Sequence, residues 1–349
     1  EANIPRILPD QRRFKNMERI ESPVYRRLGN SGLVVPSVGI GCNNLGRPGT
    51  PTRTQEGTNE VIAAAVDAGI SFFDIADLYG AEPGLSETMF GTALTQLGLD
   101  RDELTIVTKF GLPVGDLNGN DRNARGSRRY IMRAVEGSLR RLGTDYIDLY
   151  FYHSPDPNTP IEETLSALDQ LVRDGKVRYL GHSNFSGWQL AHAEHCAREL
   201  GTERFIVAEN HYNLLDRRAE LEILPAARHF GMGVLPYFPL ANGLLTGKYR
   251  RDNIPAGSRL SHSKKNVLDA ANWDQLEAFH SFCTERGITE VQAAFSWLAQ
   301  QSPVTSVIAG ATSAEQVRAN AQAACLRFDA EDLAALDAIF PAPEKIALF

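Results

Sequence analysis

The chain has 349 residues, of which 43% are hydrophobic and 23% charged, a globular composition that excludes a disordered or collagen-like protein. Its 36 basic and 43 acidic residues give a net charge of −7, so no overall positive field favours nucleic acid or an anionic membrane as a partner. The four cysteines have no CxxC spacing, no apolar run is long enough to span a membrane, and the N-terminus has no apolar signal segment, so we expect a cytoplasmic protein.

Amphipathic segments that end in glycine alternate along the chain with short apolar runs, which predicts alternating helices and strands. Each run follows the previous one at the distance that a parallel crossover requires. The eight predicted strands lie at residues 35–41, 70–77, 103–109, 146–153, 176–183, 204–210, 232–237 and 303–310. Eight strands in this alternation predict an α/β protein with a (β/α)8 TIM barrel as its single domain.

The predicted barrel covers residues 25–340, after an N-terminal extension at 1–24 and before a C-terminal tail at 341–349. A long polar loop, residues 240–272, interrupts the regular alternation, and such loops are often functional. A doubly wound Rossmann sheet is the main alternative. However, the segment after the first strand, 39–44, lacks the third glycine of the GxGxxG motif, so the barrel is favoured.

Four residues that can do chemistry lie at the ends of three consecutive predicted strands or just after them: Asp74, Tyr79, Lys109 and His153. Active sites of such barrels lie at this end of the strands. An ammonium stabilises a nearby phenolate, so Lys109, held by Asp74, would help Tyr79 to donate a proton. His153 could hydrogen-bond a carbonyl. Each residue alone could be structural, but their shared position predicts carbonyl reduction with hydride from a cofactor, and no metal.

Longer segments carry a resemblance to one family: RLGNSGLVVPSVGIGC, DAGISFFDIADLYG, SETMFGTAL, GSLRRLGTDYIDLY, GKVRYLGHSNF, YNLLDRRAE, GLLTGKY and VIAGATSAEQVRAN. Through them, residues 25–340 closely resemble the aldo-keto reductase superfamily, in the branch of bacterial enzymes and potassium-channel β subunits. The resemblance implies a TIM barrel, a catalytic tetrad at the four residues above, and a nicotinamide cofactor extended across the barrel mouth.

The same resemblance assigns cofactor contacts to individual positions. Ser183 and Asn184 match the residues that bind the nicotinamide carboxamide, and Tyr237 matches the aromatic residue that stacks on its ring. The segment 240–248, with Gly243 and Gly247, matches the loop over the pyrophosphate. Gly310, Thr312, Gln316 and Asn320 match the segment around the adenosine half. The other cofactor positions implied in this way are Gly41, Cys42, Asn43, Glu209, Phe238, Pro239, Leu240 and Leu245.

Three departures from the family pattern concern the cofactor. Glu209 stands where most relatives have a glutamine, and an ionised carboxylate can accept from the carboxamide but cannot donate. Gly310 and Gln316 replace the basic residues that NADPH-preferring relatives use for the 2′-phosphate. We expect Lys248 and Arg259 to take over that role, so the prediction is NADPH, with NADH the weaker ligand. Lys264 and Lys265 are further candidates for the phosphate.

Other readings of the sequence remain open. A Schiff-base aldolase could use Lys109, and a cofactor-sensing binding protein with slow turnover would fit the channel-β-like ending. His192, His195 and Cys196 imitate metal-ligand spacing, but no further ligand pair accompanies them, so we interpret the segment as an ordinary helix. The expected partner is a small carbonyl compound, with no nucleic acid or membrane; a homo-oligomer is left open.

Overall fold

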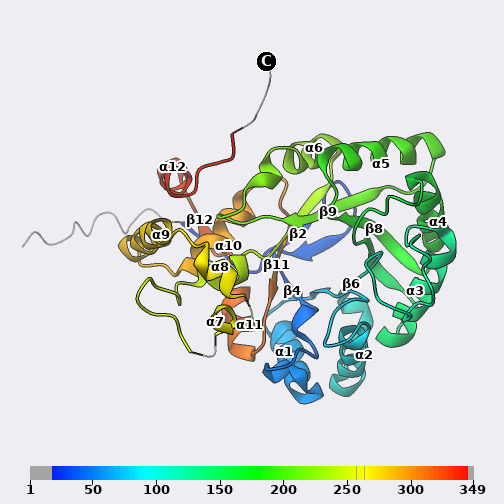
Figure 1. Ribbon diagram of the computed structural model, residues 1–349, viewed down its shortest axis with the longest axis horizontal. Helices are drawn as coiled ribbons and strands as arrows, with labels where there is room; N and C mark the ends of the chain where they lie inside the picture. The colour runs from blue at the N-terminus through cyan, green and yellow to red at the C-terminus, as the bar shows by residue number, and fades with distance from the viewer. Residues whose placement is uncertain (1–17, 257, 263, 345–349) are drawn as a thin grey trace, which may run out of the picture.

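The computed structural model describes residues 18–256, 258–262 and 264–344, apart from the side chains of Arg259 and His262. Its centre is an eight-stranded parallel sheet in the order β10-β9-β8-β7-β6-β5-β4-β11. A parallel bridge between Val234 and Val304 links β10 to the segment that enters β11, so the sheet curls into a nearly closed barrel (Figure 1). The strands are β4 (Val38–Gly41), β5 (Phe72–Asp74), β6 (Thr105–Phe110), β7 (Ile147–Tyr152), β8 (Val177–Ser183), β9 (Phe205–His211), β10 (Gly233–Tyr237) and β11 (Val307–Gly310).

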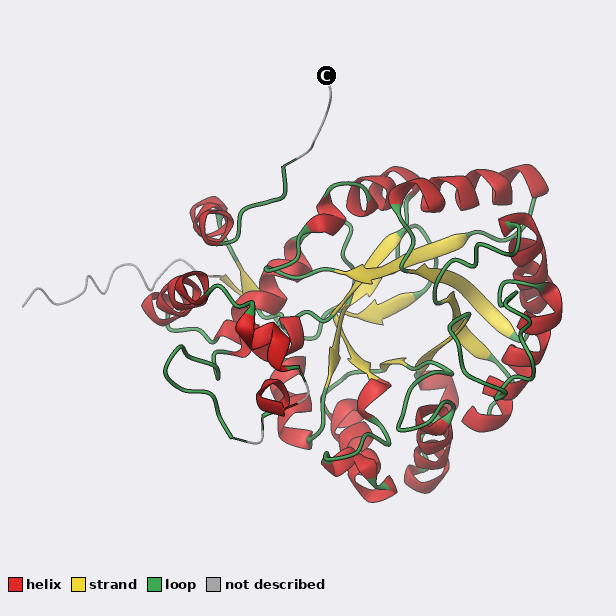
Figure 2. Ribbon diagram, viewed as in Figure 1, coloured by secondary structure: helices red, strands yellow, loops and turns green. Residues whose placement is uncertain are grey.

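Helices fill the connections between successive strands and form a ring outside the barrel (Figure 2). Gly98, Gly143 and Gly201 end three of them in the left-handed conformation, as the glycine stops in the sequence predict. The (β/α)8 TIM barrel is therefore confirmed, and the Rossmann alternative is wrong. The ring consists of α1 (Gln55–Asp67), α2 (Leu85–Leu97), α3 (Arg128–Leu142), α4 (Ile161–Arg173), α5 (Gly187–Leu200), α6 (Ile223–Phe230), α10 (Glu290–Gln300) and α11 (Ala314–Ala321).

A hairpin of β2 (Tyr25–Arg27) and β3 (Val34–Pro36) covers the N-terminal end of the barrel. Its buried Leu28 and Val35 join the inner core, which Phe72, Leu149, Phe151 and other inward-facing strand residues form. The predicted first strand was therefore wrong at its start, because Val34–Pro36 pairs with the hairpin and the barrel strand begins at Val38. Plugging this end leaves the opposite rim, where the strands end, for function.

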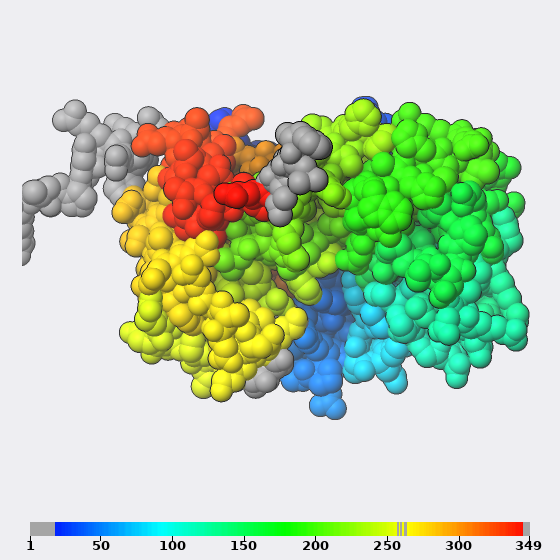
Figure 3. All heavy atoms as spheres, turned by 45° about the horizontal axis from the view of Figure 1, so that its top comes forward, coloured from blue at the N-terminus to red at the C-terminus, as the bar shows by residue number. Residues whose placement is uncertain are grey.

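The remaining elements lie beside the barrel. In the described part of the N-terminal extension, β1 (Glu18–Arg19) pairs with β12 (Leu326–Arg327), while residues 1–17 lie outside the described chain. The long polar loop contains the 3-10 segment η6 (Ala241–Thr246), α7 (Arg259–His262) and α8 (Lys265–Asp269). Helix α12 (Ala330–Ile339), red in Figure 3, packs against α9 (Trp273–Arg286), yellow in that view. None of the helices in the described residues has the length and apolarity to cross a membrane.

Candidate active site

The rim formed by the strand ends gathers most of the predicted site residues. Asp74 is the last residue of β5, Lys109 lies one residue before the end of β6, and His153 directly follows β7. Parallel pairing places neighbouring strand ends side by side, with Asp74 opposite Gly41 and Ser183 opposite Glu209. The barrel therefore brings together, at one end, residues that the sequence separates by up to 168 positions, counted from Gly41 to Glu209.

Lys109 is the centre of this cluster and is fully buried. Its ammonium donates to the Asp74 carboxylate, to the Tyr79 hydroxyl at 3.2 Å and to the Ile75 carbonyl at 3.2 Å. Tyr79 lies in the loop between β5 and α2. Its backbone N–H donates to the Ala76 carbonyl, and its own carbonyl accepts from the Ser86 backbone N–H. The predicted linkage of Asp74, Lys109 and Tyr79 is thus present as a chain of direct contacts.

Burial has the largest effect on the pKa values of the three contacting side chains, Asp74, Lys109 and Tyr79. Burial alone would lower the pKa of Lys109, but the carboxylates of Asp74 and Glu209 outweigh it, so the pKa lies above its ordinary value and the amine stays charged. Burial raises the pKa of Tyr79, Lys109 lowers it, and the two carboxylates raise it again. The expected lowering by Lys109 is therefore present, but the net direction of the Tyr79 pKa is upward because burial, together with the two carboxylates, outweighs it.

His153 faces Tyr79 with an edge-to-face ring contact, the centroids lying 5.9 Å apart. Burial, with a smaller contribution from Lys109, holds the pKa of this imidazole well below its usual range. The ring is therefore neutral at ordinary pH. Its Nδ1 is buried and has no hydrogen-bond partner among the described residues. A neutral ring beside the Tyr79 phenol can hydrogen-bond a carbonyl oxygen without adding charge to the site.

Glu209 is closer to this chemistry than the sequence indicates. Its side chain is 2% exposed, and its Oε2 lies 3.4 Å from the Lys109 ammonium. Burial, followed by the repulsion of Asp74, raises the pKa of Glu209 to about 8, although Lys109 opposes the rise. Oε2 makes no hydrogen bond within the described structure. Glu209 therefore raises the pKa of Lys109, the residue that binds the Tyr79 hydroxyl, and this effect does not depend on a contact between Glu209 and a cofactor.

The residues predicted to contact the nicotinamide, namely Ser183, Asn184 and Tyr237, form one hydrogen-bonded group beside the predicted tetrad. Ser183 donates to the Glu209 carbonyl at 2.9 Å, and Asn184 donates to the His153 carbonyl at 2.9 Å. The Tyr237 hydroxyl donates to the Asn184 side chain at 2.8 Å. His211, which sequence reasoning missed, stacks on the Tyr237 ring with centroids 5.4 Å apart. Its position two residues after Glu209, on the same face of β9, was the available signal.

The segment after β10 holds unusual backbone. Phe238, Ala241 and Asn242 have φ values of 53°, 46° and 60°, and Gly243 and Gly247 are also left-handed. Asn184, across the rim, has a φ of 61°. Residues other than glycine adopt this conformation at a cost, and such strain gathers at ligand sites. The concentration of strain around 238–247 supports the prediction that this segment, which includes Pro239, Leu240 and the buried Leu245, approaches a ligand closely.

Basic side chains reach this segment from two directions. Lys248 is exposed and lies over the Tyr249 ring at 5.0 Å. Lys264 donates to the Asn242 side chain at 3.1 Å and lies over the Phe238 ring at 5.3 Å, so the structure brings this lysine to the predicted pyrophosphate loop. Lys265 is exposed in α8. Arg259 begins α7, but its side chain lies outside the described structure, so its predicted phosphate contact stays a prediction.

The predicted adenosine segment lies where β11 meets α11. Gly310 pairs with Gly41, and a Cβ on Gly310 would approach the Asn44 amide to 2.7 Å. The Gln316 side chain accepts from the Thr312 backbone N–H at 2.9 Å and from the Thr312 hydroxyl at 3.2 Å. These bonds hold the segment before α11 against the first turn of that helix. Asn320 is buried one turn further along the helix. Cys42 is also buried beyond the end of β4, Asn43 is half-buried there, and burial raises the pKa of the Cys42 thiol.

Comparison with known proteins agrees with this geometry. The model of the Aldo/keto reductase family matches residues 37–340. The chain is 39% identical over 323 residues to "Uncharacterized oxidoreductase YrpG" of Bacillus subtilis, covering 91% of this chain and 96% of the relative. It is 36% identical over 333 residues to "L-glyceraldehyde 3-phosphate reductase" of Escherichia coli K12, covering 92% and 94%. It is also 35% identical over 312 residues to "Putative voltage-gated potassium channel subunit beta" of Schizosaccharomyces pombe, covering 86% and 87%.

Proposed function

The chain belongs to the aldo/keto reductase family, and from that premise we propose that it is an NADPH-dependent oxidoreductase that reduces an aldehyde or ketone to the alcohol. The observation that carries the proposal is the Lys109 ammonium, which binds Asp74 and the Tyr79 hydroxyl at the strand ends of the barrel. A structural role alone would not require a buried lysine, a phenol and a neutral histidine at one rim.

The residues around the tetrad fit a nicotinamide dinucleotide. Ser183 and Asn184 present polar side chains beside His153, and the Tyr237 ring offers a flat surface next to them. The left-handed segment 241–243 begins four residues after the end of β10. Lys248 and Lys264 supply positive charge at that segment. When bound, the reduced cofactor supplies the hydride for the carbonyl carbon. We propose NADPH because these lysines and Arg259 offer phosphate ligands.

The residues of the chain then have distinct tasks. Tyr79 donates a proton to the carbonyl oxygen, and in the oxidative direction it accepts one. Lys109 stabilises the phenolate that remains after the transfer, and Asp74 keeps Lys109 charged and in place. The neutral His153 orients the carbonyl through a hydrogen bond. Burial of Asp74, Lys109 and His153 strengthens these interactions because little water competes for them.

Two other functions are less well supported. A Schiff-base aldolase needs a neutral amine as nucleophile, whereas Asp74 and Glu209 hold the Lys109 pKa above its ordinary value and keep the amine charged. A cofactor-sensing binding protein is favoured by relatives named as potassium-channel β subunits. Tight NADPH binding without useful turnover would distinguish it from the reductase. All four cysteines are free thiols, which supports the proposal of a reducing compartment such as the cytoplasm.

The test combines cofactor binding with turnover. NADPH and NADH are titrated separately into the full chain, and reduction of a carbonyl panel, including L-glyceraldehyde 3-phosphate, is followed through nicotinamide absorbance. We expect tighter binding of NADPH, and we expect Tyr79→Phe to lower kcat at least roughly 100-fold while the Kd for NADPH stays within about twofold. Failure to bind either nucleotide, or turnover by Tyr79→Phe at the native rate, would overturn the proposal.

A further inference from the structure

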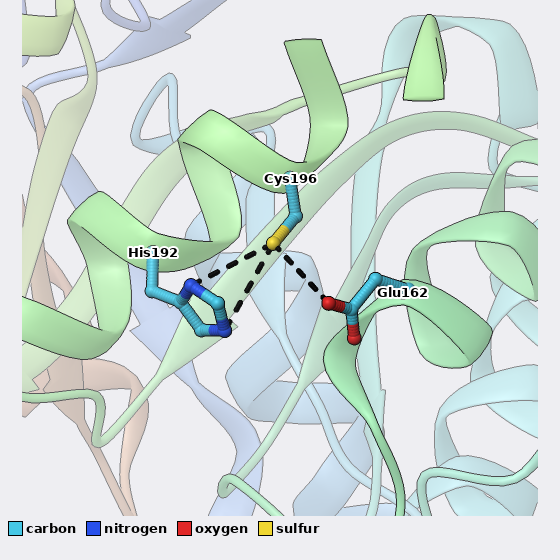
Figure 4. Close-up of side chains that lie close together, drawn as sticks. All are labelled: Glu162, His192 and Cys196. Atoms are coloured by element: carbon cyan, nitrogen blue, oxygen red, sulfur yellow. Dashed lines mark hydrogen bonds between the residues drawn. The ribbon is translucent and has the colours of Figure 1, made fainter. Parts of the chain in front are cut away.

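A second cluster of reactive side chains lies outside the barrel mouth, between α4 and α5. His192 and Cys196 are one turn apart on α5, and Glu162 reaches them from the first turn of α4 (Figure 4). The Cys196 sulfur lies 3.6 Å from His192 Nδ1 and 3.7 Å from a Glu162 carboxylate oxygen. All three groups offer donor atoms that lie within 4.8 Å of one another. The predicted reading of His192, His195 and Cys196 as an ordinary helix overlooked Glu162, which lies 30 residues before His192 in the sequence.

We propose that Glu162, His192 and Cys196 form a zinc-binding site that joins α4 to α5. In a tetrahedral zinc site, bonds of about 2.3 Å to sulfur and about 2.0–2.2 Å to nitrogen or oxygen separate the sulfur from either other donor by roughly 3.5–3.7 Å. The distances from the Cys196 sulfur to His192 Nδ1 and to the Glu162 carboxylate match this separation, and the exposed His192 ring, whose Nε2 lies 3.9 Å from the sulfur, would turn to aim Nδ1 at the ion. Thiolate, imidazole and carboxylate together are a donor set typical of zinc, and three protein ligands leave the fourth position for water.

The local charge and packing suit a divalent cation. Zinc would displace the thiol proton into solvent and leave two negative ligands around the doubly charged ion, which neutralises the site. The exposed Trp188 stacks on the His192 ring with centroids 6.4 Å apart.

The geometry distinguishes a metal site from a nucleophilic cysteine. In a catalytic triad the acid orients the histidine, and the histidine alone contacts the nucleophile. Here both Glu162 and His192 contact the sulfur. A protonated thiol can donate to only one of these neighbours at a time, whereas a metal ion would bind all three groups together.

The test uses the tag-free, metal-depleted full chain. Calorimetric titration with Zn²⁺ is expected to show one tight site, and Co²⁺ in its place should give the near-ultraviolet thiolate-to-cobalt band together with the visible bands of tetrahedral cobalt. Glu162→Gln and His192→Gln change exposed side chains, so they should fold, and each should weaken zinc binding at least roughly 100-fold.

His195→Gln is the matched control, because His195 is exposed on the same helix and instead contacts the Phe230 ring. It should bind zinc with unchanged affinity. Native affinity in His192→Gln, or a cobalt complex without the thiolate band, would overturn the proposal. These outcomes do not depend on carbonyl reduction, so they separate the zinc site from the proposed function.

Discussion

The substitution Glu209→Gln tests how the buried charges of the active site are balanced. The native side chain is 2% exposed, its Oε2 lies 3.4 Å from the Lys109 ammonium, and burial raises its pKa from 4.5 to about 8. Glutamine has the same shape without the charge, and Lys109 keeps its contact with Asp74 in the variant. The change therefore removes one buried negative charge with little change in packing.

The sign of the effect follows from proton linkage. Between pH 4.5 and about 8 the folded protein binds a proton at Glu209 that the unfolded chain has released, so this group lowers stability as pH rises through that window. The pKa difference corresponds to roughly 3–5 kcal/mol once the carboxyl is ionised in both states. For a chain of this size, about 1 kcal/mol shifts Tm by roughly 2 °C. Glu209→Gln should thus raise Tm by at least about 5 °C at pH 9, and much less at pH 5.

The assay is thermal unfolding of both proteins at the two pH values, with Glu194→Gln as the control. Glu194 is also 2% exposed, but it binds Arg198 at 2.7 Å and Arg204, so its substitution should lower Tm at both pH values. Because the Glu209 charge raises the Tyr79 pKa, Glu209→Gln should also move the basic limb of the turnover profile to lower pH. A Tm difference that is the same at pH 5 and pH 9 would refute the reasoning. If cofactor affinity and its pH dependence are unchanged, Glu209 is not a cofactor contact.

Two further predictions concern the cofactor and the barrel floor. Arg259→Ala should weaken NADPH binding at least roughly tenfold and NADH binding much less, because a charge-assisted contact to the 2′-phosphate is lost. Fluorescence titration measures both affinities, with Arg251→Ala as the control. Equal losses of affinity for the two cofactors would contradict the assignment. Gly29 and Gly98 both have φ near +60°, but a Cβ at Gly29 would lie 2.6 Å from the Gly231 carbonyl, whereas none of the described atoms lies within 4 Å at Gly98. Gly29→Ala should therefore cost roughly 1–3 kcal/mol more than Gly98→Ala in chemical denaturation, and equal costs would show that backbone strain alone matters there.

The sequence by itself determined the barrel and the position of its chemistry. Glycine stops and apolar runs are local signals, so they predicted the strands ending at Asp74, Ser183 and Tyr237 within a few residues. Because parallel strands in a barrel share one rim, the positions of Asp74, Lys109 and His153 in the sequence were enough to predict that they meet.

Only the tertiary structure decided which groups touch across that rim and outside it. Glu209 faces Lys109, His211 stacks on Tyr237, and Glu162 meets Cys196 because strand register and helix packing place them there. Burial then sets the ionisation of the tetrad, which turns the expected lowering of the Tyr79 pKa into a rise. Local sequence carries no record of these contacts, because they depend on distances between segments far apart in the chain and on the exclusion of water from between them.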